Sequence, residues 1–104
     1  MVDLLLRPAA TEDLNQLYDY IAERSGSAER ALGYIRRIRT RCEMLLQFPE
    51  SGRRRDDLRP NLRLIGFERR IVIAYMVLPS GDIEIGRVFY GGRDYETLLR
   101  EEDS

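Results

Sequence analysis

The central feature of the hydrophobic pattern is an uncharged run from Ile71 to Leu78. Side chains of a strand point alternately to opposite faces of its sheet. In this run both alternate sets are apolar, one being Ile71, Ile73, Tyr75 and Val77, and the other Val72, Ala74, Met76 and Leu78. A strand that is apolar on both faces is typical of the centre of a sheet covered on both sides. The pattern therefore predicts a central strand over 71–78.

One further strand is predicted before this run and one after it. Residues 62–67 form the first, and a tight reversal near Glu68-Arg69 leads into the central strand. A turn at 79–82, which reads Pro-Ser-Gly-Asp, leads into the last strand at 83–90. The alternation of this last strand slips at Gly86-Arg87. The slip predicts either a bulge or a strand end that is buried on both faces.

The first half of the chain shows helical periodicity instead. A short strand over 2–7 ends at Pro8, and Thr11 is expected to cap the helix that follows. Apolar residues recur at helical spacing in that helix, namely Leu14, Leu17, Tyr18, Ile21 and Ala22. Gly26 is expected to end it and Ser27 to cap a second helix. The second helix stops before Pro49, and its apolar seam consists of Ala31, Ile35, Ile38, Cys42 and Leu45.

These elements describe one domain over residues 1–104 with the order β-α-α-β-β-β. The polar stretch 50–61 connects the helices to the last three strands, and residues 94–99 are expected to form one or two terminal helical turns. The packing we expect is an α+β fold, with a helix hairpin on one face of a mostly antiparallel sheet. One hairpin covers one face only, so the second apolar face of the central strand predicts contact with a partner polypeptide. The alternative is that the N-terminal strand and the C-terminal segment fill this gap.

Composition narrows the chemistry that the chain can carry out. It has 104 residues, a formal net charge of −1, one Cys and no His. A His/Cys metal site and a Ser-His or Cys-His catalytic pair are thereby excluded, and we expect neither a metal nor another cofactor. All 17 basic residues are Arg, whose guanidinium groups make bidentate contacts with carboxylates and phosphates. Cys42 lies on the apolar seam and is expected to be a packing residue rather than a nucleophile.

The sequence shows neither a membrane segment nor a targeting segment. No apolar run is long enough to cross a bilayer. The first residues lack the basic start and the small-residue cleavage site of a signal peptide. We therefore expect a cytoplasmic protein that does not contact membranes.

Short segments along almost the whole chain carry a resemblance to a known family. They are Leu6-Arg7-Pro8-Ala9-Ala10, Tyr20-Ile21-Ala22-Glu23, Pro49-Glu50-Ser51-Gly52-Arg53, 57–63, Ile73-Ala74-Tyr75 and 85–94. In this order and spacing the chain resembles ParE-type toxins of the RelE/ParE superfamily of type II toxin–antitoxin systems. One departure is Tyr90, where relatives commonly carry His, so this position cannot titrate near neutral pH.

The resemblance implies a small toxin that inhibits DNA gyrase by binding, arrests growth and serves plasmid stabilisation. A ParD-like antitoxin, a ribbon-helix-helix protein, would neutralise it in a hetero-oligomer and would supply any contact with DNA. Two alternatives stay open. One is a RelE-like ribosome-dependent mRNA interferase, and the other is a non-toxic antitoxin-binding module that contributes to operon repression.

The candidate site residues follow these alternatives. For partner binding they are Arg59, Arg63, Tyr75, Arg87, Tyr90 and Arg93, with Asp94 as a capping or ion-pair companion. For the interferase they are Arg70, Arg87 and Tyr95, which would position a ribose 2′-hydroxyl and stabilise phosphate charge. Arg has too high a pKa to serve easily as a base, and Tyr is weak in that role without help. We therefore expect inhibition by binding, with no confident catalytic residue. The charged run 53–57 is expected to be a solvated loop whose charges neutralise one another.

Overall fold

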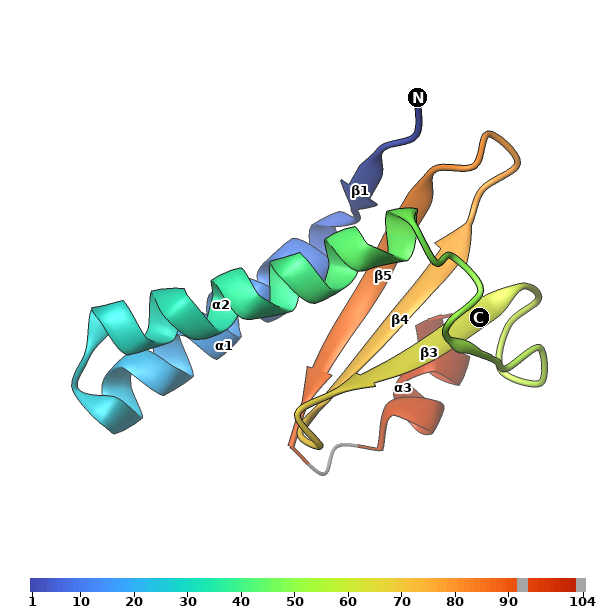
Figure 1. Ribbon diagram of the computed structural model, residues 1–104. Helices are drawn as coiled ribbons and strands as arrows, with labels where there is room; N and C mark the ends of the chain where they lie inside the picture. Colours follow the sequence, from blue (N-terminus) through green and yellow to red (C-terminus); the bar gives the residue numbers. More distant parts are fainter. Residues whose placement is uncertain (92–93, 103–104) are drawn as a thin grey trace.

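The computed structural model describes residues 1–91 and 94–102. Along the chain its elements are β1 (Leu4–Leu6), α1 (Pro8–Ser25), α2 (Ala28–Glu43), the 3₁₀ turn η1 (Met44–Leu46), β2 (Arg53–Arg54), β3 (Leu62–Phe67), β4 (Ile71–Val77), β5 (Ile83–Tyr90) and α3 (Tyr95–Glu102) (Figure 1). The predicted α+β fold and the order of its main elements are confirmed.

The sheet has five strands in the order β1-β5-β4-β3-β2, so the predicted central strand β4 lies in the middle. β1 runs parallel to β5, with Leu4 opposite Ile83, and the other pairings are antiparallel. The register between β4 and β5 shifts between Ala74 and Tyr75, opposite Gly86. This shift confirms the predicted bulge. It lets Ile85 and Val88 point to the same face of the sheet.

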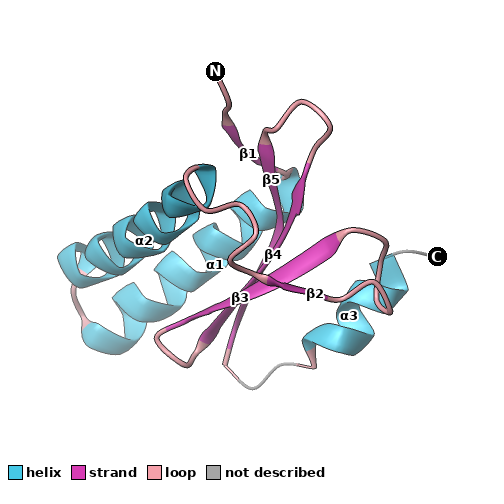
Figure 2. Cartoon of the chain, turned by 45° about the vertical axis from the view of Figure 1, so that its right-hand side comes forward, coloured by secondary structure: helices cyan, strands magenta, loops and turns pink. Residues whose placement is uncertain are grey.

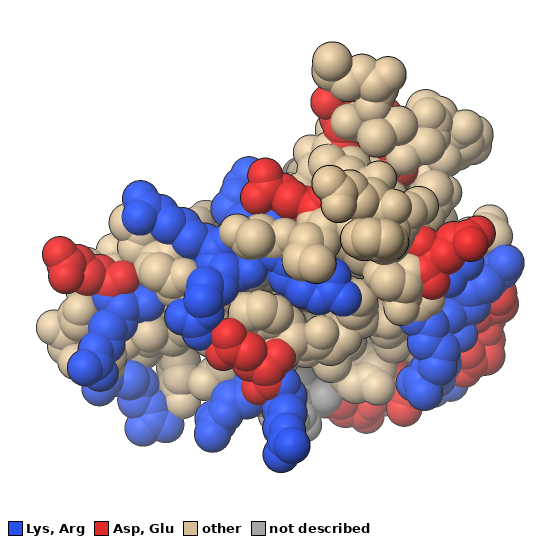
Figure 3. All heavy atoms as spheres, in the orientation of Figure 1, with Lys and Arg blue, Asp and Glu red and all other residues tan. Residues whose placement is uncertain are grey.

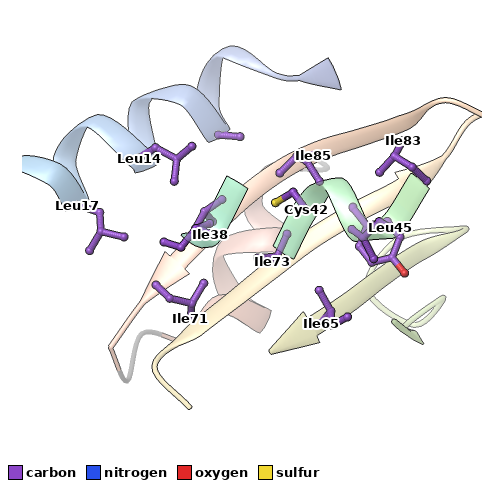
Figure 4. Packing of buried hydrophobic residues seen from close by; sticks show 13 residues of the cluster. Leu14, Leu17, Ile38, Cys42, Leu45, Ile65, Ile71, Ile73, Ile83 and Ile85 are labelled. Carbon is purple, nitrogen blue, oxygen red and sulfur yellow. The ribbon is translucent and has the colours of Figure 1, made fainter. Parts of the chain in front are cut away.

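The helix hairpin packs on one face of the sheet, as predicted (Figure 2). Its seam residues Ala31, Ile38 and Leu45 are completely buried. Ile38 and Leu45 meet Ile73 and Ile85 from the sheet in the larger core cluster (Figure 4). The apolar faces of the two helices therefore pack against the face of the central strand that carries Ile71 and Ile73.

The second face of β4 is covered by the chain itself. α3 lies on the side of the sheet opposite the helix hairpin (Figure 2). There Ala74, Phe89 and Leu99 are at most 1% exposed, and Leu58 from the connecting loop joins them in a second core cluster. The expectation that a partner must hide this face is wrong for its centre, and the alternative, in which the C-terminal segment fills the gap, describes the structure better. β1 lies at the sheet edge and does not take part in this cover.

Helix boundaries differ from the prediction at two places. α1 begins at Pro8, its N-cap Arg7 is extended with no side-chain cap, and Thr11 already lies inside the helix. Pro fits the first helical position because its missing N–H would have no partner there. α2 ends at Glu43 and continues as a 3₁₀ turn before Pro49. The predicted roles of Gly26 and Ser27 are confirmed, since Gly26 is left-handed and Ser27 accepts the Arg30 amide at 3.2 Å.

Candidate functional site

The predicted partner-binding residues do not form a single surface. Arg63 and Tyr75 are cross-strand neighbours on β3 and β4. The Tyr75 hydroxyl donates to the Pro49 carbonyl at 2.8 Å and accepts the Gly52 amide at 2.8 Å. Arg63 Nη1 donates to the Gly52 carbonyl at 2.7 Å. Tyr75 is 0% exposed, so its side chain offers a partner no surface and instead anchors the loop that follows α2.

The anchored loop borders a hollow that measures about 640 Å³. Its wall includes Pro49, Arg63 and Val77. Phe48 stands at its rim and is 59% exposed. The hollow is therefore a mixed apolar and cationic depression whose shape depends on the Tyr75 hydroxyl.

Arg87 is committed to a contact inside the chain. Its Nε and Nη2 donate to the two carboxylate oxygens of Asp13 at 2.7 and 3.0 Å. The Arg87 side chain is 16% exposed and that of Asp13 is 7% exposed. Asp13 Oδ2 also accepts the Val88 amide at 2.8 Å. This group joins α1 to β5, and it gives Arg87, which was predicted for partner binding and for the interferase, a structural role.

Arg59 lies near the face of the sheet that α3 covers. It borders a hollow of about 370 Å³, of which Arg7, Arg87 and Leu99 are also part of the wall. The hollow lies where the start of α1, the β4–β5 pair and α3 meet. Arg59 and Arg87 therefore border the same hollow, whereas Arg63 and Tyr75 hold the loop.

Tyr90 and Arg70 come together at a third place. Both line a hollow of about 350 Å³ between the helix hairpin and the β3–β4 turn. The Tyr90 ring packs on Tyr20 of α1, with 5.4 Å between ring centroids. The Arg70 carbonyl accepts the Gly91 amide at 3.0 Å. Tyr90 thus shares a surface with Arg70, which sequence reasoning had placed in the alternative interferase set.

The three residues of the interferase alternative are not brought together. Arg70, Arg87 and Tyr95 line three different hollows. Tyr95 begins α3 and packs near Phe89, at 6.1 Å between ring centroids. Within residues 1–91 and 94–102 no group of His, Cys, Asp or Glu side chains could hold a metal ion. Arg93 lies outside the described residues.

The charged run 53–57 forms paired contacts, as expected. Arg54 binds Asp56 and Arg55 binds Asp57, each through two hydrogen bonds of 2.8 and 2.9 Å. Arg55 also pairs with Glu96 of α3. The Arg55 hydrogen bonds lower the pKa of Asp57 to about 2. These contacts tie the loop to α3, and Asp94 caps that helix by accepting the Thr97 amide at 3.2 Å.

Sequence reasoning missed several residues that build these places. Asp13 was not among the candidate site residues, yet its carboxylate binds Arg87 and Val88 of β5. Tyr34, Arg37 and Glu68 line the hollow of Tyr90, with Glu68 bound to Arg37 by hydrogen bonds of 2.9 to 3.1 Å. Only the opposite charges of Arg37 and Glu68 hinted at this contact. Their separation of 31 positions is invisible to helical or strand periodicity.

Comparisons with known proteins agree with this architecture. A family model described as "ParE toxin of type II toxin-antitoxin system, parDE" matches residues 4–95. A solved chain titled "Chromosomal ParDE TA system from P. aeruginosa" is 26% identical, covers 88% of this chain and 97% of its own length, and superposes with a TM-score of 0.74. The search of curated proteins finds no match. No helix in the described part of the chain is long and apolar enough to cross a membrane.

Proposed function

The chain belongs to the ParE toxin family of type II toxin–antitoxin systems, and from this premise we propose that it inhibits DNA gyrase by binding and is neutralised by a ParD-like antitoxin. The observation that carries the proposal is the family match over residues 4–95, supported by the likeness to a chain of a ParDE system. Free toxin would act in the cytoplasm and arrest growth, with plasmid stabilisation as one use of that activity. The antitoxin would form a hetero-oligomer with it and supply any contact with DNA.

Inhibition by binding is favoured over catalysis by the positions of the candidate residues. Arg70, Arg87 and Tyr95 line separate hollows, and the Arg87 guanidinium is bound to Asp13. General acid–base catalysis needs its groups within hydrogen-bond reach of one reacting atom. An mRNA interferase is therefore the second candidate, and it is tested alongside the first.

The partner surface that we propose follows from the same positions. Tyr90 and Arg59 contribute side chains to hollows at the surface. Arg63 and Tyr75 would contribute through the loop that they hold, and Arg87 through the end of β5. A role of Arg93 in partner binding stays a prediction from the sequence.

A supercoiling assay tests the gyrase proposal. Purified protein in molar excess should prevent gyrase from supercoiling relaxed plasmid and should trap a cleaved DNA complex. The antitoxin encoded beside the toxin gene should restore supercoiling. A variant with Ile73→Asp is the control, because a buried, unpaired carboxylate in β4 should unfold the domain. Unaltered supercoiling by the folded wild-type protein would contradict the proposal.

Two further assays separate the alternatives. Ribosome-dependent cleavage of mRNA by the purified protein, with gyrase unaffected, would favour the interferase. Cells that induce the protein without its antitoxin should stop growing. If these cells divide normally while the protein still binds its antitoxin, the chain is a binding module that no longer acts as a toxin.

A further inference from the structure

An arginine–tyrosine recess lies where the helix hairpin meets the β3–β4 turn. It is the hollow of about 350 Å³ lined by Ile21, Arg30, Tyr34, Arg37, Glu68, Arg70 and Tyr90. Of the described residues that line it, three carry a guanidinium group and one carries a carboxylate. The whole chain has a net charge of −1, so this local excess of positive charge sets the recess apart. Figure 3 shows arginine side chains gathered over the helix hairpin, whereas the protruding end near the N-terminus is largely uncharged.

The recess already binds one carboxylate, which belongs to the chain itself. Glu68 lies across Arg37 with its two oxygens 2.9 and 3.1 Å from the guanidinium Nη2 and Nε. Arg30 and Arg70 are exposed on the same recess, and no carboxylate of the described chain is paired with either. Arg30 and Arg70 therefore carry two further guanidinium groups that can bind carboxylates from outside.

The turn at the rim of the recess has a sequence poorly suited to its backbone. Glu68 and Arg69 have φ angles of 49° and 63°, and the Arg70 amide closes the turn on the Phe67 carbonyl at 3.3 Å. Such a turn favours Asn-Gly, and a non-Gly residue in the left-handed region costs about 1 kcal/mol or more. Sites where a local rule is broken are often functional sites. This strain is a second observation, independent of charge, that points to the recess.

The aromatic rings around the recess favour a polypeptide over a nucleic acid. The Arg37 guanidinium lies 5.0 Å from the centroid of Tyr34, and the Arg24 guanidinium lies 5.1 Å from that of Tyr20. The Tyr20 ring also packs on Tyr90. Base stacking needs free ring faces, and these contacts leave fewer of them at the recess. Tyr and Arg at the surface of a partly apolar recess are typical of the energetic centres of protein interfaces.

We propose that the arginine–tyrosine recess binds an acidic segment of the antitoxin, with carboxylate side chains of that segment bound to Arg30 and Arg70 and its apolar side chains packed on Ile21 and Tyr90. The assignment rests on the proposed function for the identity of the partner. Charge complementarity and the strained turn support the location and the chemistry.

The test measures the affinity of purified toxin for the full-length antitoxin encoded beside it, by calorimetry at low and high salt. The double variant Arg30→Gln/Arg70→Gln should bind roughly tenfold more weakly and with a smaller salt dependence. The double variant Arg30→Glu/Arg70→Glu should bind more weakly still, because it places carboxylates opposite carboxylates. The matched controls are Arg36→Gln/Arg39→Gln and Arg36→Glu/Arg39→Glu, which change two exposed arginines of α2 outside the recess. Melting temperatures establish that all variants are folded.

Each outcome decides between the proposals. Weaker binding by the recess variants, with control variants within about twofold of wild type, supports the recess. If the recess variants bind like their controls, the recess assignment falls while the antitoxin partnership stands. If wild-type toxin does not bind the antitoxin, the proposed function and the recess assignment both fall. An oligothymidine strand that binds wild type but not Arg30→Gln/Arg70→Gln would overturn the choice of an acidic polypeptide.

Discussion

Asp13 and Val88 are joined by a hydrogen bond that replaces a strand pairing. β1 pairs with β5 only as far as Ile85, and beyond that point the Asp13 carboxylate of α1 accepts the Val88 amide at 2.8 Å. The same carboxylate binds the Arg87 guanidinium. The Asp13 side chain thus binds both an edge amide and a partly buried cation. It can do so because α1 lies beside β5 at the point where the pairing of β5 with β1 ends.

Removing this carboxylate should destabilise the protein strongly. Asp13→Ala would leave the Arg87 guanidinium and the Val88 amide without their acceptor, and we expect a loss of about 3 kcal/mol in the free energy of unfolding. Urea denaturation measures the loss. The double variant Asp13→Leu/Arg87→Met should recover part of it, because no charge is then left buried and alone. A loss below about 1 kcal/mol for Asp13→Ala would contradict this account.

Two glycine substitutions should change stability in opposite directions. A Cβ at Gly52 would lie 2.6 Å from the Tyr75 ring and hydroxyl, so Gly52→Ala should destabilise the protein by about 1–3 kcal/mol through overpacking. A Cβ at Gly33, inside α2, would meet no atom within 4 Å. Gly33→Ala should therefore stabilise the helix by about 0.5–1 kcal/mol. Thermal melts of both variants test the pair, and equal effects would refute the role of Tyr75 as the loop anchor.

The β3–β4 turn should become more stable when its strain is relieved. Arg69 has a φ of 63°, so Arg69→Gly should raise the free energy of unfolding by roughly 0.5–1 kcal/mol. Arg69→Ala is the matched control. It removes the same side chain but keeps the backbone strain, so it should bring no gain. Equal stability of the two variants in urea would show that the turn is unstrained.

Acid should weaken the contact between Arg55 and Asp57. Arg55 lowers the pKa of Asp57 to about 2 in the folded protein, whereas the unfolded value is about 3.9. A lowered folded pKa stabilises the fold above the unfolded value, and this contribution disappears as the pH falls from about 4 to about 2. The difference in urea midpoint between wild type and Asp57→Asn should shrink over that range. A constant difference would contradict the pairing.

Cys42 should react only when the protein unfolds. The thiol is 4% exposed on the seam of α2, and burial raises its pKa to about 11. A thiol reagent near pH 8 should therefore leave folded protein unmodified and modify it in urea. Rapid labelling of the native protein would show that the helix hairpin opens easily or that the seam is wrongly packed.

Periodicity predicted those helices and strands in which residues two to four positions apart share one face. The bounds of β3 and β5 are those expected, and the seam from Ala31 to Leu45 is buried as expected. β2 was missed because two exposed arginines pair through their backbone alone. The start of α1 was placed too late because Thr11 suggested a cap, while Pro8 already fixes a helical first residue.

The site was harder to predict because its residues meet across long stretches of chain. Tyr75 was expected on an apolar face of the central strand and in partner binding, but its hydroxyl reaches the Pro49–Gly52 loop, which no spacing rule foresees. The pair of Arg37 and Glu68 depends in the same way on how α2 lies over the β3–β4 turn. The cover of the second sheet face was underrated because Leu58 of the connecting loop and Leu99 of α3 meet there, although 41 positions separate them in the sequence.

The parallel pairing of β1 with β5 governs how the protein can be made. Leu4 finds its partner Ile83 near the far end of the chain, and the Asp3 amide binds Asp82. During synthesis β1 leaves the ribosome first, and the helix hairpin that follows can form from local contacts. The first strand must wait, unpaired, until almost the whole polypeptide has been translated. For most of its synthesis the nascent chain therefore cannot complete its sheet, which closes only once β5 has left the ribosome.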